Sequence, residues 1–114
     1  MTKSLRIATV DLNGQFRGKR VATSFMGKEM RLPLSALNVD IFGADIEGSP
    51  LVFDSGDKDG IMVTANREPI PLPWVAGSAY LDLRTMHQDD GTPFVGDPRL
   101  ALSAVLDRYA QRGW

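Results

Sequence analysis

The sequence predicts an α+β domain with a mixed or mostly antiparallel sheet, a short helix and a long C-terminal helix. An Asn13-Gly14 dipeptide stands between two runs of strand-forming residues, which indicates a β-hairpin near the start of the chain. Near the other end, "DPRLALSAVLDRYAQRGW" has apolar residues at helical spacing. Several strand-like runs separated by Gly and Pro lie between them, and strands followed by a long helix are typical of α+β proteins.

Length and composition limit the class of protein. The chain has 114 residues, of which 43% are hydrophobic, so we expect one domain over residues 1–114 with a modest core. A net charge of −1 argues against nucleic acid and anionic membranes as partners. Cysteine is absent, and the lone His87 cannot form a metal site by itself. No apolar run has the length of a membrane span or a signal peptide, so we expect a cytoplasmic protein.

The first hairpin should turn at Asn13-Gly14. Two-residue hairpin loops of type I′ need positive φ at both central residues, which Asn tolerates and Gly adopts freely. The second strand carries a basic cluster of Arg17, Lys19 and Arg20. From the local sequence, these three side chains are expected to be solvated or ion-paired at their positions on the strand.

The middle of the chain predicts short elements. One helical turn is expected before Pro33, because proline disfavours helix at the residue before it. Residues 37–46 should form an extended segment that ends in a turn at Gly43. A second hairpin is predicted from Leu51–Phe53 and Ile61–Thr64, which flank an acidic, glycine-rich loop.

The last third predicts a loop, a strand and a helix. Pro69, Pro71 and Pro73 favour an extended surface loop, and a strand over residues 80–86 should stop at the Asp90-Gly91 turn.

In the C-terminal helix Asp97 is placed to cap and Pro98 to occupy the first helical position. Gly113 is a natural C′ residue, and Trp114 should pack back onto the helix. The helix has one apolar stripe, formed by Ala101, Leu102, Val105, Leu106 and Tyr109.

Acidic residues occur in pairs at Asp45-Glu47, Asp57-Asp59 and Asp89-Asp90, all in expected turns where Asp bonds nearby backbone donors. With Gly60 as the invariant glycine, the second pair fits a calcium loop. However, Ser55 then takes the first ligand position and Asn66 the place of the bidentate Glu, so no metal site is predicted. The chain has no Gly-Lys-Ser/Thr phosphate loop and a single histidine, so the residues alone indicate no self-contained active site.

Several longer strings resemble a known family. In order they are "VDLNGQFRGKRV", "LPLSALNVDIFG", "GDKDGI", "PLPW" and "DDGTPFVGDPRLALSAVL". Together they resemble the N-terminal β-grasp domain of glutamine synthetase family ligases, with the γ-glutamylpolyamine synthetase branch most similar. The resemblance implies ATP-dependent joining of ammonia or an amine to the γ-carboxylate of glutamate, through γ-glutamyl phosphate. It also implies that ATP, Mg²⁺ and glutamate bind a larger catalytic C-terminal domain that this chain lacks, so we expect no cofactor bound here and no activity from this piece alone.

The resemblance also implies a site residue and partners. The family's N-terminal domain packs against the neighbouring subunit's catalytic domain in a homo-oligomeric ring, where an Asp-Gly-Ser-Ser loop supplies an aspartate to the ammonium site. The corresponding stretch "NVDIFGADIEG" makes Asp40 the catalytic candidate, with Asp45 as its rival. A carboxylate there attracts a cationic amine and can accept its proton. Ile41-Phe42-Gly43 replaces the Gly-Ser-Ser, which fits a substrate larger than ammonia, and the alternative for Asp40 is a strand-end residue that bonds backbone.

The family string also contains the basic cluster, so the resemblance implies that Arg17, Lys19 and Arg20 serve the inter-subunit contact. Two other functions stay open. One is a free-standing β-grasp module that binds protein partners without catalysis, since one fold hosts many functions. The other is a regulatory fragment that inserts into the ring of a full-length relative. If a missing domain normally covers the C-terminal helix, its apolar stripe should be exposed here.

Overall fold

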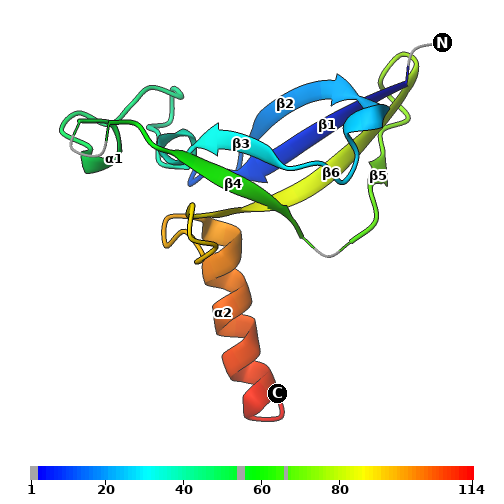
Figure 1. Ribbon diagram of the computed structural model, residues 1–114. Coiled ribbons are helices and arrows are strands. Elements are labelled where there is room, and N and C mark those ends of the chain that lie inside the picture. Colours follow the sequence, from blue (N-terminus) through cyan, green and yellow to red (C-terminus); the bar gives the residue numbers. More distant parts are fainter. Residues whose placement is uncertain (1–2, 54–55, 66) are drawn as a thin grey trace.

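A computed structural model describes residues 3–53, 56–65 and 67–114, and in it six strands form a mixed sheet (Figure 1). The strands are β1 (Lys3–Val10), β2 (Phe16–Ala22), β3 (Met30–Pro33), β4 (Asp59–Thr64), β5 (Ile70–Pro71) and β6 (Ser78–His87). The α-helices are α1 (Pro50–Phe53) and α2 (Pro98–Gln111), and 3₁₀ turns occur at Thr23–Phe25 and Leu34–Leu37. The predicted α+β class, with a short helix and a long C-terminal one, is confirmed.

The strand order is β2-β1-β6-β4-β3, with β5 beside β6. The central pair, β1 and β6, is parallel, and the other pairs are antiparallel. β6 is long enough for its first part, up to Leu83, to pair with β1 while Arg84 to His87 pair with β4. It therefore joins the two halves of the sheet.

Each face of the sheet has its own apolar cluster, because successive strand residues point to opposite faces. Ile7 belongs to one cluster and Ala8 to the other. The larger cluster consists of Leu5, Ile7, Leu34, Leu37, Met62, Met86 and Phe94. The smaller consists of Ala8, Leu72, Ala79 and Leu81.

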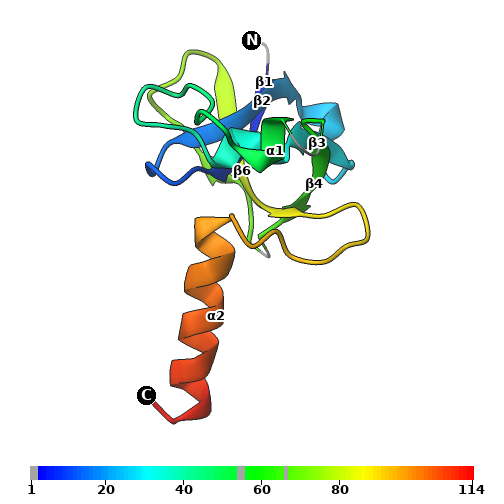
Figure 2. The same cartoon turned by 90° about the vertical axis from the view of Figure 1, so that its left-hand side faces the viewer.

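Helix α2 projects away from the sheet, and none of its residues is buried (Figures 1 and 2). As predicted, Asp97 caps it, Pro98 is its first residue and Gly113 has positive φ (73°). The Trp114 ring packs on Tyr109 with centroids 5.5 Å apart, which confirms the expected contact. The apolar stripe is exposed, with fractions such as 54% for Leu102.

The first hairpin is confirmed, but the prediction that it has a two-residue type I′ turn is wrong. The Asp11 N–H donates to the Gln15 carbonyl (2.9 Å), the Gly14 N–H donates to the Asp11 carbonyl (3.1 Å), and Gly14 has positive φ (77°) while Asn13 does not. This is a three-residue loop, residues 12–14, with glycine at its left-handed position. The Asp11 side chain favours it by accepting the backbone N–H groups of Asn13, inside the loop, and of Gln15, directly after it.

In the middle of the chain one further prediction fails, one holds in part, and one strand was missed. Leu51–Phe53 belongs to helix α1 and not to a strand, since Pro50 suits the first position of a helix. In residues 37–46 the predicted turn at Gly43 is confirmed, but the segment before it forms only one isolated bridge, Val39 to Asp45, and no continuous strand. Strand β3 was not predicted, although the expected helical turn occurs just before it at Thr23–Phe25.

Near the prolines the prediction holds in part. Arg67, Glu68, Pro73 and Trp74 are exposed, as expected of a surface loop. However, Ile70–Pro71 forms strand β5, Leu72 is buried in the smaller cluster, and a turn follows it. The strand predicted over residues 80–86 is confirmed, and a turn with Gly91 at positive φ follows it.

Candidate functional site

The loop from Asp40 to Ala44 carries the sequence-predicted site residue. Its backbone closes through Asp40 N–H to the Ala44 carbonyl (2.9 Å) and Gly43 N–H to the Asp40 carbonyl (3.0 Å). Inside it, Oδ1 of Asp40 accepts the N–H groups of Phe42 (2.8 Å) and Ala44 (3.0 Å). The Asp40 side chain therefore hydrogen-bonds to the backbone, as the alternative interpretation of this residue predicted.

These bonds use one carboxylate oxygen. Within the described part of the chain, the other oxygen of Asp40 has no hydrogen-bond donor. The side chains beside it point to solvent: Ile41 is 79% exposed and Phe42 is 87% exposed. Asp45 is also exposed, and it contacts this loop region through its bridge with Val39. The Asp40 loop therefore presents an acidic oxygen next to apolar surface.

A second loop, from Asp11 to Gln15, has the same construction. Oδ1 of Asp11 accepts the N–H groups of Asn13 (2.8 Å) and Gln15 (2.9 Å), while Oδ2 pairs with Nε of Arg17 (2.9 Å). Burial alone would raise the pKa of Asp11, but the Gln15 N–H, the Arg17 guanidinium and the Asn13 N–H together hold that pKa below its ordinary value. The carboxylate of Asp11 is therefore a charged, buried support for this loop.

The two loops lie side by side. Nδ2 of Asn13 donates to the carbonyls of Asp40 (2.9 Å) and Val39 (3.2 Å). The Arg17 guanidinium lies against Gly43, where an added Cβ would be 3.0 Å from Nη2. Arg17 is thus engaged within its own chain, whereas Lys19 and Arg20 are exposed. Whether the basic cluster contacts another subunit stays a prediction.

The acidic pairs prove to be mainly turn residues. Asp89 pairs with Arg31 (2.6 Å). The hydroxyl and N–H of Thr92 bind Asp90 and lower the pKa of its carboxyl. Asp57 accepts a hydrogen bond from Ser35, and the calcium-loop positions Ser55 and Asn66 lie outside the described residues.

Two further observations concern metals and membranes. Residues 3–53, 56–65 and 67–114 contain no group of three or more His, Asp or Glu side chains that would hold a metal ion. In the same residues, no helix is long and apolar enough to cross a membrane.

Sequence reasoning missed one buried ion pair in β6. Nη2 of Arg84 lies 3.0 Å from Oδ2 of Asp82, and Nη1 donates to the carbonyls of Lys28 (2.9 Å) and Met62 (3.0 Å). The pair could have been predicted from the sequence, because two opposite charges two residues apart lie on the same face of a strand. The pair fixes β6 to the Lys28 and Met62 backbone.

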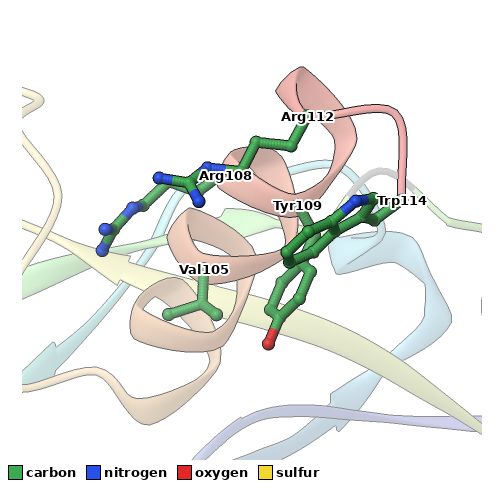
Figure 3. Close-up of a pocket in the computed structure, with 5 residues that line it drawn as sticks. All are labelled: Val105, Arg108, Tyr109, Arg112 and Trp114. Carbon is green, nitrogen blue, oxygen red and sulfur yellow. The ribbon is translucent and has the colours of Figure 1, made fainter.

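Several hollows lie on the described surface, and two of them adjoin the loops and helix α2. A groove of about 500 Å³ runs past the loops and is lined by Leu12, Asn38, Ile46, Glu47, Phe94 and Val95, among others. On α2, a hollow of about 250 Å³ lies among Val105, Arg108, Tyr109, Arg112 and Trp114. Figure 3 shows the Tyr109 and Trp114 rings together on one side of it, with Arg108 extending away from them. The guanidinium carbon of Arg112 lies over the Trp114 ring, 5.9 Å from its centroid. Both hollows are open surface features.

Comparison with known proteins identifies a curated relative of this chain. No family model matches the chain. The sequence is 32% identical over 118 residues to the γ-glutamylputrescine synthetase PuuA of Escherichia coli (strain K12), and the match covers 98% of this chain and 24% of that protein. The chain thus spans about a quarter of the length of this relative. Over nearly its whole length it resembles a γ-glutamylpolyamine synthetase of the glutamine synthetase family, as its motifs predict.

Proposed function

We propose that this chain is the N-terminal β-grasp domain of a glutamine-synthetase-like, ATP-dependent ligase. The full enzyme would join ammonia or an amine, with a polyamine as the preferred candidate, to the γ-carboxylate of glutamate. The supporting observation is the match itself, which covers almost all of this chain and only a quarter of a γ-glutamylputrescine synthetase. We assign the ATP, Mg²⁺ and glutamate sites to the remaining part of such an enzyme.

We propose that Asp40 is this domain's contribution to the active site between subunits. Its loop is on the surface, and one carboxylate oxygen is free of hydrogen bonds from the described residues. That oxygen would attract the ammonium form of the amine and accept a proton from it. The freed nitrogen lone pair then attacks the carbonyl carbon of the γ-glutamyl phosphate, and the new C–N bond displaces phosphate. The exposed Ile41 and Phe42 would lie along the methylene chain of a larger amine.

We propose that the rest of the polypeptide covers the apolar stripe of α2 in a cytoplasmic, homo-oligomeric ring. The support is that Leu102, Leu106 and Tyr109 are each about half exposed, at 54%, 56% and 49%. Contiguous apolar surface of this kind marks sites of protein contact. The same stripe also favours the second function, a free-standing β-grasp module that binds a protein partner without catalysis.

The first experiment is to sequence the gene beyond the codon for Trp114 and express the complete reading frame. Release of ADP that depends on both glutamate and an amine, tested with ammonia and putrescine, together with a γ-glutamyl amide identified by mass spectrometry, would support the ligase. A complete protein that releases no ADP with either nitrogen source would refute it and favour the binding module.

Variants then test the site. We expect Asp40→Asn to lower kcat/KM for the amine by about 100-fold, with the KM for ATP unchanged, because it removes the charge and the proton acceptor. Asp45→Asn decides between the two candidates, and Glu68→Gln is an exposed acidic control in another loop. If Asp40→Asn behaves like Glu68→Gln, Asp40 has no catalytic role.

A further inference from the structure

We infer that Asn13 is a positioning residue that sets the direction of the Asp40 side chain, with Arg17 as its support. The inference concerns how the Asp40 loop is held, and its catalytic meaning rests on the proposed function. It also gives a role to residues of the hairpin motif "VDLNGQFRGKRV" that the turn alone does not explain, because Asn13 in this motif contacts a residue 27 positions later in the chain.

The two hydrogen bonds of Asn13 are placed on both sides of Asp40. The Val39 carbonyl belongs to the peptide group that precedes the Asp40 Cα, and the Asp40 carbonyl belongs to the peptide group that follows it. Nδ2 of Asn13 donates to both, at 3.2 and 2.9 Å. Because a peptide group is planar, holding both carbonyls restricts φ and ψ of Asp40 together. The backbone then fixes the direction in which the Asp40 side chain leaves the loop.

Arg17 supports the same loop from its glycine. Its guanidinium is oriented by the ion pair with buried Asp11 and lies against Gly43, whose φ is +81°. Gly43 is the residue whose N–H closes the turn on the Asp40 carbonyl. One hairpin therefore holds the Asp40 loop at two points, the carbonyls around Asp40 and the glycine that ends the turn.

The hairpin does not need the Asn13 amide for its own fold. Its loop is closed by backbone bonds and by Oδ1 of Asp11, which binds backbone N–H groups. Asn13 is exposed, and within the described residues its side chain bonds only Val39 and Asp40. Replacing this side chain should therefore loosen the Asp40 loop and leave the hairpin in place.

The first test is amide hydrogen exchange by NMR on the 114-residue chain. In Asn13→Ala we expect the Phe42 and Ala44 amides, which Asp40 holds, to exchange at least about tenfold faster, while amides of the β1–β2 ladder do not change. Asn13→Asp should behave the same way, because an isosteric carboxylate cannot donate to two carbonyls. The matched control is Gln15→Ala in the same loop, with no change at Phe42 or Ala44. Unchanged exchange at those two amides in Asn13→Ala would overturn the inference.

The second test uses the complete enzyme and separates this inference from the proposed function. We expect Asn13→Ala to lower kcat/KM for the amine by about tenfold with the KM for ATP unchanged, and to have no further effect in an Asp40→Asn background. Additive effects would overturn the claim that Asn13 acts through Asp40. If Asp40→Asn has no kinetic effect while Asn13→Ala still speeds exchange at Phe42 and Ala44, the catalytic proposal fails and the positioning role stands.

Discussion

The carboxylate of Asp97 binds the backbone of Met86, 11 residues earlier in β6: Oδ2 accepts the Met86 N–H at 2.7 Å. Its other oxygen, Oδ1, accepts the N–H groups of Arg99 (2.8 Å) and Leu100 (3.2 Å) at the start of α2. The side chain is buried, with 1% of its surface exposed. A single carboxylate therefore links the central strand to a helix that otherwise stands in solvent.

Removing this link should destabilise the domain. Asp97→Ala removes a helix cap and leaves the buried N–H of Met86 without a partner, at a cost of roughly 2–4 kcal/mol in the free energy of unfolding. Urea denaturation of the 114-residue chain measures it. Asp107→Ala, on an exposed position of α2, is the control and should change stability by less than about 0.5 kcal/mol. Equal effects of the two variants would contradict the linking role.

Removing one partner of the buried Asp82–Arg84 pair should destabilise the domain strongly, whereas replacing both residues by apolar ones should destabilise it much less. Arg84→Ala leaves the Asp82 charge buried without its partner, and we expect a loss of roughly 3–5 kcal/mol. The double variant Asp82→Leu/Arg84→Met removes both charges and retains most of the volume, so it should recover much of that loss. Thermal and urea unfolding compare the two proteins. A double variant that is less stable than Arg84→Ala would show that the pair itself is strongly stabilising.

The lowered pKa of Asp11 predicts that the stability of the folded chain depends on pH. In the folded chain the pKa of Asp11 is lowered from an ordinary value near 3.8, so its contribution to stability is complete above that value and is lost as the pH falls through the lower folded pKa. Asp11→Asn should therefore be less stable than the parent at pH 7, and the difference should shrink at pH 3 and below. Urea denaturation at several pH values measures this. A difference that stays constant down to pH 2 would exclude a charged Asp11 as the cause.

The stripe on α2 should matter for assembly and not for the fold of this domain. Leu102→Ala and Leu106→Ala remove side chains that are more than half exposed, so the chain alone should lose less than about 0.5 kcal/mol. Leu37→Ala, in the core, is the contrasting variant and should cost roughly 2–5 kcal/mol. In the complete enzyme we expect the two α2 variants to reduce the ring fraction in analytical ultracentrifugation. An intact ring in both would show that this stripe is not covered there.

The parts predicted best from the sequence depend on neighbours along the chain. Helix α2 has its cap, its proline and its terminal glycine within one continuous segment, and all three were predicted. The first hairpin was predicted for the same reason. Its turn type was not, because the choice of a three-residue loop depends on where the Asp11 side chain finds donors.

The parts missed depend on contacts between distant segments. Met30–Pro33 becomes a strand because β4 lies beside it, and its own four residues carry little preference. For the site, the family resemblance selected Asp40, and no pattern in the sequence pairs Asn13 with a carbonyl 27 residues away. The Asp82–Arg84 pair was visible only as two charges in a strand, and burial gives them their importance.

The parallel pairing of β1 with β6 also sets an order for folding during synthesis. The β1–β2 hairpin needs only residues up to Ala22, but β1 pairs with β6 through residues as late as Leu83. At about 5–20 residues per second, a ribosome needs roughly 3–12 s to add the intervening segment. During that time one edge of β1 has no strand beside it, which is the state in which chains pair wrongly. The emergence of β6 is therefore the event that converts a lone hairpin into a protected sheet.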